Sequence, residues 1–395
     1  MKLFPVKCKK RTRTAGMDEV KAFTIMRKDT EVMKVDFGAL QYEVRSEDYL
    51  PYPIRGKLRE IPDPRSIRSA YDMTQSVIAA RKNEEAVVSW LANRVLLLSR
   101  ANAKWIYNLF HFEQVGTDEQ RVKIALTCRA ASVSDPYWLR FEEDEDICWS
   151  KVDVKQNPLN EVVAQVALHG KSLTLQGSMV TPELTTNGVY AKAWRRHPDG
   201  KLWLYKLGAN GNTESRIEVM CSNLLDKMNV EHVHYEAGVD EGKYVCMCPC
   251  MTTETKAILT GMEFISYCNV NGLNPEEEMF RIDRESIYKM WIVDFLISNR
   301  DRHRQNWGFF YDTETMDILG CHPLFDHNNA FDIDFMRDMD APYQFGEMTI
   351  KQAAMKAMGE EDFCFTAPIS RDDFITERQY FSFKKRAACL GLNVK

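Results

Sequence analysis

The feature that most constrains the fold of this chain is a polar loop, two short extended runs and a further acidic residue, in that order. The loop is Asn299-Arg300-Asp301-Arg302-His303-Arg304-Gln305-Asn306, and Leu324-Phe325-Asp326 ends the series. The runs between them surround Asp312-Thr313-Glu314-Thr315 and predict a β-hairpin. Because a hairpin returns the chain to where it started, we expect Asn306 and Asp326 to reach one common ion.

These side chains match the needs of phosphoryl transfer. The oxygens of Asn306 and Asp326 are hard ligands that suit Mg2+, which also shares phosphate oxygens of ATP. Asp301 lies five residues before Asn306 and would be free to orient and deprotonate an acceptor hydroxyl. The series therefore predicts an ATP- and Mg2+-dependent phosphotransferase with Asp301 as the catalytic base.

A lysine and a glutamate further upstream fit the nucleotide side of such a site. A hairpin is predicted from a strand over Val189 to Arg195, a turn at His197-Pro198-Asp199-Gly200 and a returning strand over Lys201 to Leu207, and a helix follows from Thr213 to about Met228. Lys206 is central in the returning strand and would neutralise the α- and β-phosphates. A helix glutamate usually holds this lysine, and Glu218 is the candidate, with Glu214 as the second choice. The preceding loop, Gly177 to Gly188, is expected to cover phosphates with its backbone N–H groups.

Each of these residues has a simpler interpretation when it is taken alone. A lone strand lysine is usually a solvated edge residue, a helix glutamate a surface charge, and Asp-Arg-His a polar turn. His303 is expected to brace the loop through hydrogen bonds rather than act on phosphate. The complete order from the lysine strand to Asp326 favours phosphoryl transfer over a chance arrangement.

The composition sets wider limits on the class of protein. With 395 residues, of which 45% are hydrophobic and 28% charged, a globular protein of two or three domains is expected. A net charge of −5 gives no reason to expect nucleic-acid or membrane binding. The basic residues among the first thirteen predict a solvated arm, with a contact to nucleic acid or anionic lipid as the alternative. No run is apolar enough to span a membrane.

The eleven cysteines lack paired spacing, which predicts a reducing compartment, the cytoplasm. Cys246, Cys248 and Cys250 alternate, which favours one face of a strand over zinc ligands.

The patterning predicts an α+β fold with two lobes and a ligand cleft between them. Residues 1–155 form an accessory region, 156–250 a sheet-rich lobe, and 251–395 a mainly helical lobe that holds the polar loop. Helical periodicity covers Ser69 to about Phe112, with a separate short helix from Ser99 to Leu109. A second helix is predicted from Ser286 to Ser298, capped by Asp283, and a strand over Ser172-Leu173-Thr174-Leu175.

The loop with Trp307-Gly308-Phe309, together with Pro323-Leu324-Phe325-Asp326, resembles the HipA-like serine/threonine kinases. These are bacterial proteins with a protein-kinase-like fold, several of them toxins of toxin–antitoxin pairs. The resemblance covers residues 285–331 most strongly and 170–250 moderately. It implies that Asp301 is the catalytic base, that Asn306 and Asp326 bind Mg2+, that Lys206 and Glu218 form the ATP-binding pair, and that the substrate is a protein. An antitoxin is a partner to test for.

Two further segments resemble an N-terminal module of some HipA-like proteins. They are Arg94 to Phe112 and Asp135-Pro136-Tyr137-Trp138.

The chain departs from this pattern in two places. His327-Asn328 replace the usual Phe-Gly after Asp326, so the usual activation-segment switch is not expected. The loop Gly177 to Gly188 is rich in Ser and Thr. In the proteins it resembles, autophosphorylation of a loop serine inactivates the kinase. Self-phosphorylation at Ser178, Thr181, Thr185 or Thr186 is therefore a hypothesis.

Two other functions stay open on the sequence. Phosphatidylinositol kinases share the Asp-Arg-His-x-x-Asn pattern, so a small molecule or a lipid head group is an alternative acceptor. A non-catalytic pseudokinase that senses nucleotide is the third interpretation. The intact Asp301, Asn306 and Asp326 favour catalysis over that last function.

Overall fold

The computed structural model describes residues 22–113, 115–144, 146–174, 180–209, 212–334 and 336–394. The predicted basic arm and Ser178 lie outside these residues.

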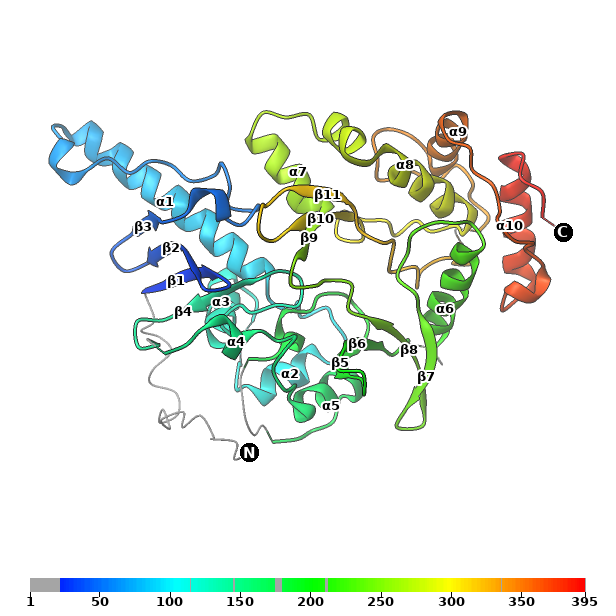
Figure 1. Cartoon of the computed structure of the whole chain (residues 1–395), viewed down its shortest axis with the longest axis horizontal. Coiled ribbons are helices and arrows are strands. Elements are labelled where there is room, and N and C mark those ends of the chain that lie inside the picture. Colours follow the sequence, from blue (N-terminus) through cyan, green and yellow to red (C-terminus); the bar gives the residue numbers. More distant parts are fainter. Residues whose placement is uncertain are drawn as a thin grey trace.

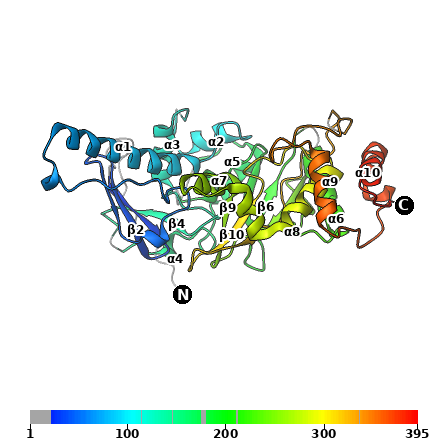
Figure 2. The same ribbon diagram turned by 90° about the horizontal axis from the view of Figure 1, so that it is seen from above.

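The first part of the chain forms an antiparallel sheet with helices beside it. Its strands have the order β3-β2-β1-β4 and comprise β1 (Ala22–Arg27), β2 (Thr30–Asp36), β3 (Gln41–Val44) and β4 (Tyr137–Arg140). The helices are α1 (Ala70–Asn93), α2 (Ala103–Leu109), α3 (Asp118–Thr127), α4 (Trp149–Val152) and α5 (Glu161–His169). The Ser69 hydroxyl caps α1 by accepting the Asp72 N–H. Figures 1 and 2 show α1 projecting at one end of the molecule and α10 at the other.

A second antiparallel sheet carries the predicted lysine strand. Its order is β5-β6-β8-β7, with β5 (Lys192–Arg196), β6 (Leu202–Lys206), β7 (Glu236–Asp240) and β8 (Lys243–Pro249). The predicted hairpin is confirmed: β5 and β6 pair so that Lys192 lies opposite Lys206. Helix α6 (Thr213–Asp226) follows and packs against β8. Cys246 and Cys248 are buried on β8, as a strand face requires.

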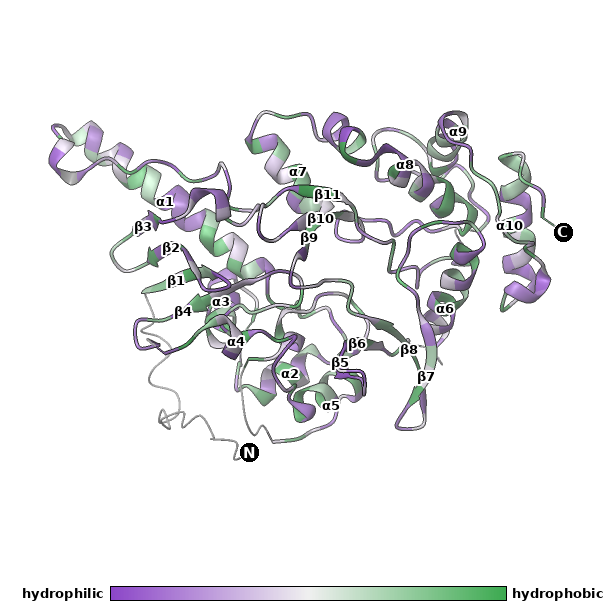
Figure 3. Ribbon diagram, in the orientation of Figure 1, coloured by the Kyte–Doolittle hydropathy of each residue, from purple (hydrophilic) through white to green (hydrophobic). Residues whose placement is uncertain are grey.

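In the residues that the structure describes, the last part of the chain combines a small sheet with four α-helices. The strands are β9 (Lys256–Thr260), β10 (Gly308–Asp312) and β11 (Ile318–Cys321), in the order β11-β10-β9. The helices are α7 (Gly261–Val270), α8 (Pro275–Leu296), α9 (Ile350–Glu360) and α10 (Glu377–Cys389). The predicted hairpin before Asp326 is β10 and β11, and β9 adds a third strand. In Figure 3 hydrophobic and hydrophilic bands alternate along α6 and α10, which is typical of helices with one face on a core.

The predicted cap at Asp283 is confirmed. Asp283 has non-helical backbone angles inside α8 (φ −157°, ψ 77°), and its Oδ1 accepts the N–H of Ser286 at 3.1 Å. The second half of α8 therefore begins at its own N-cap, and Trp291 and Phe295 on this half are fully buried.

Two local predictions are wrong. Residues 171–174 form no strand and are exposed, because the alternating Ser172-Leu173-Thr174 has no core to cover; Leu175 lies outside the described residues. The helical run to Phe112 breaks after Asn93 and resumes only at Ala103, since Asn102 takes a left-handed backbone (φ 64°) just before α2. The second helix is therefore shorter than the predicted Ser99–Leu109.

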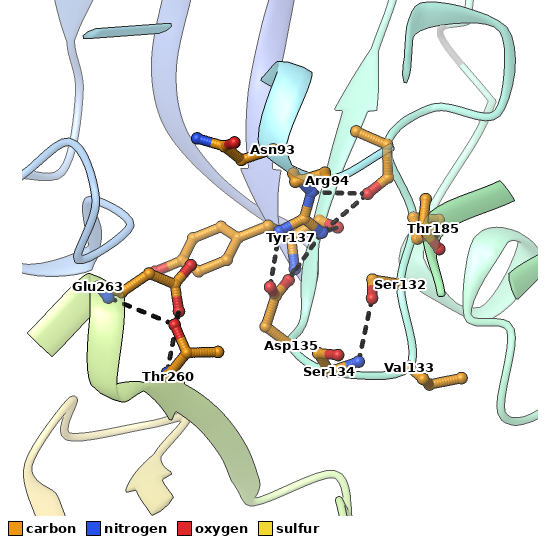
Figure 4. A network of polar contacts seen from close by, with 12 residues as sticks. Asn93, Arg94, Ser132, Val133, Ser134, Asp135, Tyr137, Thr185, Thr260 and Glu263 are labelled. Carbon is orange, nitrogen blue, oxygen red and sulfur yellow. Dashed lines mark hydrogen bonds and ion pairs between the residues drawn. The ribbon is translucent and has the colours of Figure 1, made fainter. Parts of the chain in front are cut away.

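One partly buried ion pair joins the two motifs that resemble an N-terminal module (Figure 4). The Arg94 guanidinium donates to the Asp135 carboxylate at 2.6 and 2.9 Å and to the carbonyl of Ala130 at 2.8 and 3.0 Å. Asp135 also accepts the N–H of Tyr137 at 3.0 Å. Arg94 thus fixes the turn that leads into β4.

Backbone hydrogen bonds link this first region to both later parts. Leu96 donates to Leu184 (2.9 Å), Ala101 to Val189 (2.7 Å), and Ile258 on β9 to Ser134 (2.9 Å). The division at residues 155 and 250 stays a prediction, and these bonds cross it. Among the described helices, none has the length and apolar character needed to cross a membrane.

Candidate active site

Lys206, at the end of β6, is the buried centre of the candidate site. Its side chain is 6% exposed, and its Nζ lies 3.0 Å from Asp326 Oδ1 and 3.4 Å from Glu218 Oε2. It also donates to the Tyr235 hydroxyl at 3.0 Å. Three of the predicted residues, from a strand, a helix and a loop, therefore meet at one amine.

The charges of this trio depend on one another. Burial alone would lower the pKa of Lys206, but Glu218, Tyr235 and Asp326 outweigh it and raise that pKa well above its ordinary value. Burial would raise the pKa of Asp326, but Lys206 and Lys192 outweigh it and lower that pKa. Burial raises the pKa of Glu218, which has the longer contact with the lysine. The site thus holds an ammonium and an ionised Asp326.

The predicted loop holds Asp301 and Asn306 together. Asn306 is buried, and its amide nitrogen donates to the Asp301 carbonyl at 3.0 Å. That bond uses the amide nitrogen and not the amide oxygen of Asn306, so this oxygen and the Asp326 carboxylate stay the predicted ligands of Mg2+, which prefers oxygen. His303 accepts the Gln305 N–H at its Nδ1 (3.2 Å), so it braces the loop as expected.

Arg302 ties this loop to the segment that carries Asp326. It is fully buried and pairs with Asp294 of α8 at 2.9 Å. The same guanidinium donates to the carbonyls of Asn306 and Phe325, each at 2.8 Å. One side chain therefore sets the separation of the two predicted metal ligands.

Two asparagines after Asp326 connect the predicted base to the predicted metal ligand. Asn328 donates to Asp326 Oδ1 at 2.8 Å, and Asn329 donates to Asp301 Oδ2 at 2.6 Å. Asp326 has a left-handed backbone (φ 62°), a conformation that Asp and Asn tolerate better than most residues. The sharp bend places both asparagines beside the two carboxylates.

Comparison with known proteins identifies the fold. No protein-family model matches the sequence, and no curated protein matches it. Among solved structures, the HipA toxin–antitoxin complex of Shewanella oneidensis MR-1 with HipB and operator DNA matches with a TM-score of 0.53 at 11% identity, over 94% of this chain and 98% of the other. The chain has a HipA-like kinase fold. A proinflammatory kinase of Helicobacter pylori, CtkA, also matches, at a TM-score of 0.39 and 12% identity over 51% of this chain and 89% of the other.

Within this HipA-like fold, Lys192 is a candidate site residue that sequence reasoning missed. It is buried at the start of β5, opposite Lys206. A Cβ on Gly188 would lie 2.1 Å from its Nζ, so the loop before β5 closes on this amine. Burial, and then the charge of Lys206, lower the pKa of Lys192 to about 8. The register of the β5–β6 hairpin was the signal that could have found it.

The described part of the loop before β5 is fixed by Arg100 from the first region. Arg100 is buried and donates to the carbonyls of Glu183 (3.2 Å), Thr186 (2.8 Å) and Lys192. The Glu183 carboxylate in turn accepts the N–H of Trp194 at 3.1 Å. The first region of the chain therefore shapes the loop that is predicted to cover phosphates.

Proposed function

We propose that this chain is an ATP- and Mg2+-dependent kinase that phosphorylates serine or threonine in a protein. The observation that carries the proposal is the buried Lys206 between Glu218 and Asp326, in a HipA-like fold. In protein kinases a strand lysine paired with a helix glutamate binds nucleotide phosphates, and a nearby aspartate binds Mg2+, which are the roles we propose for Lys206, Glu218 and Asp326.

In the proposed reaction, the chain's own residues bind and orient the reactants. Lys206 and Lys192 neutralise the nucleotide phosphates, and Asp301 accepts the proton of the acceptor hydroxyl. Asn306 and Asp326 would hold Mg2+, which when bound neutralises charge on the phosphates during transfer. Arg302 keeps these side chains at a fixed separation through the carbonyls of Asn306 and Phe325.

The decisive experiment is transfer of radiolabelled γ-phosphate from ATP in the presence of Mg2+. We expect the wild-type protein to label itself or an added protein, and Asp326→Asn to lose about 10²-fold or more of that rate. Asn suits the left-handed backbone at this position, so the change tests the charge rather than the fold. Asp334→Asn, at an exposed aspartate eight residues along, is the matched control and should label normally.

Other outcomes point to the alternative functions. If label reaches only small acceptors, the chain is a small-molecule or lipid kinase. If ATP binds but neither transfer nor hydrolysis occurs, it is a pseudokinase.

Peptide mapping of the labelled protein tests self-phosphorylation. Thr181 and Thr185 are buried, and the Thr185 hydroxyl donates to Ala131 at 2.9 Å. Thr186 is half-buried, and its hydroxyl donates to the Pro182 carbonyl at 2.6 Å and accepts the indole N–H of Trp194 at 2.9 Å. We therefore propose Ser178 as the acceptor in this loop, and label on other peptides alone would contradict that choice.

The HipA structure contains HipB and operator DNA, and a HipB-like antitoxin is the partner that we propose for this chain.

A further inference from the structure

A cluster of metal-ligating side chains lies at the end of α6, apart from the residues described above. It comprises Asp226, the last residue of α6, with His232 and His234, and one ligand atom of each lies within 4.8 Å of the others. Asp226 Oδ1 is 3.3 Å from His234 Nδ1 and 3.7 Å from His232 Nε2. Ligand atoms around a tetrahedral ion with bonds of about 2.0–2.1 Å lie about 3.3 Å apart. The distances from Asp226 Oδ1 to the two imidazole nitrogens, 3.3 and 3.7 Å, are therefore near the spacing that one such ion needs.

His232 is oriented as a metal ligand. Its Nδ1 donates to the Val230 carbonyl at 2.8 Å, which leaves Nε2 of the neutral ring as an electron-pair donor. Backbone carbonyls hold many ligating histidines in this way. The Ser222 hydroxyl lies 3.2 Å from Nε2 and also accepts the Tyr235 N–H at 3.0 Å, so an ion at Nε2 would replace one hydrogen bond from this serine.

The cluster is open to solvent through a cavity. The side chains of Asp226 and His234 are 48% and 67% exposed, and all three residues line a cavity of about 530 Å³. His322 lines the same cavity, and its buried Nε2 has no hydrogen-bond partner among the described residues. An ion can therefore enter, and water can complete its coordination.

We propose that Asp226, His232 and His234 bind one transition-metal ion of the zinc class. Two imidazoles and one carboxylate suit Zn2+ better than Mg2+, which prefers oxygen ligands. This site does not depend on the proposed kinase activity.

The position of this site gives the ion a bracing role. Val233 donates to the Leu324 carbonyl at 2.9 Å, and Leu324 donates to Glu231 at 3.0 Å. Leu324 lies two residues before Asp326, and α6 also carries Glu218. The ion would bind Asp226 at the end of α6 and the two histidines on either side of Val233. It would therefore connect α6 to the segment that hydrogen-bonds to Leu324, two residues before Asp326.

Calorimetric titration with Zn2+ alone tests the site, using full-length protein treated with chelator and free of nucleotide. We expect one Zn2+ per chain and a rise in melting temperature. His234→Ala, at an exposed position that should not impair folding, should weaken Zn2+ binding at least about tenfold and remove the rise. Asp226→Asn should act in the same direction.

His111→Asn is the matched control, because His111 is exposed and Asn suits its left-handed backbone (φ 61°). It should bind Zn2+ like the wild type. Equal Zn2+ affinity in the wild type and His234→Ala would overturn the proposal, because the ion would then be held elsewhere. Absence of Zn2+ binding by the folded wild type would overturn it as well.

Discussion

Asp301 and Asp326 are aspartates of one site in different surroundings. Asp326 is neutralised by Lys206 at 3.0 Å, whereas the Asp301 carboxylate accepts from the neutral amide of Asn329 at 2.6 Å. A carboxylate that serves as a base has to stay available to a proton. The surroundings therefore suit Asp326 to a metal ion and Asp301 to the acceptor hydroxyl.

Asp301→Asn should reduce the turnover number by about 10²-fold or more and leave nucleotide affinity nearly unchanged. The substitution removes the proton acceptor but keeps the size of the side chain. Parallel measurements of phosphoryl transfer and of ATP binding would check both parts. Wild-type turnover in this variant would show that the base is a different residue.

Lys192→Met should weaken ATP binding and remove its pH dependence near pH 8. The pKa of Lys192 is about 8, so its positive charge is present below that pH and is lost as the pH rises. In the wild type, affinity for the anionic phosphates should therefore fall between pH 7 and pH 9. Binding measured at both pH values would test this, with the exposed Lys201→Met as the control. The same fall in wild type and Lys192→Met would exclude Lys192 as its source.

Among single residues, spacing along the chain was enough to single out the candidates of the site, whose roles stay predictions. Asp301, Asn306 and Asp326 follow from one loop and one hairpin, and Lys206 with Glu218 from a strand followed by a helix. Arg302 and Asn329 were missed because their partners, Phe325 and Asp301, are set by tertiary contacts. Polar side chains in a loop have no sequence periodicity from which such tertiary contacts could be predicted.

At the scale of elements, α8 supports the polar loop through one buried pair. Asp294 of α8 accepts from Arg302 at 2.9 Å and from the Tyr343 hydroxyl at 2.6 Å, and all three residues are buried. Burial would lower the pKa of Arg302, but Asp294 outweighs it and raises that pKa. The helix therefore holds the loop by charge as well as by packing.

Asp294→Ala should lower the free energy of unfolding by about 3–5 kcal/mol, because it leaves the Arg302 charge buried without its partner. Urea unfolding would measure the loss, with exposed Asp334→Asn as the control that should change little. A loss below about 1 kcal/mol would mean that water replaces the carboxylate.

Elements with strong periodicity were predicted well, and those that depend on partners were not. The hairpin of β5 and β6, helix α6 and the capped half of α8 follow from local patterns. Strand β7 is partly exposed along its length and contains Gly238, so it lacks the apolar alternation that would reveal it. The strand wrongly predicted at 172–174 is the opposite case. Polar and apolar residues alternate there, but no neighbouring strand pairs with them.

At the scale of the whole molecule, unfolding exposes histidines that the fold keeps neutral. Burial lowers the pKa of His322 to about 4, compared with about 6.5 in an unfolded chain. Below pH 6.5 the unfolded chain therefore binds a proton that the folded chain does not. This histidine thus favours unfolding as the pH falls from 6.5 toward 4.

The stability of the wild type relative to His322→Leu should fall by about 1.4 kcal/mol for each pH unit between 6.5 and 4. The comparison between the two proteins cancels the other titrating groups. Urea unfolding at pH 7 and pH 5 would measure it. A difference that does not change with pH would show that His322 takes up its proton in the folded state.

The likeness to HipA covers 94% of the chain, so it includes the first region as well as the two predicted lobes. Sequence resemblance was weak in that region, yet its residues reach the candidate site through Arg100 and the loop before β5. The overall arrangement was predictable from the order of elements. The contacts between regions were not, because they join residues far apart in sequence.

Two buried arginines donate hydrogen bonds to main-chain carbonyls. Arg100 donates to Glu183 and Thr186, and Arg302 donates to Asn306 and Phe325. A carbonyl is the same group in every residue, so these contacts do not depend on which side chains their acceptors carry. Over evolutionary time, substitutions at many acceptor positions can accumulate while the arginines still hold the backbone in place. A fold held by such contacts can be preserved even when related sequences retain little detectable identity.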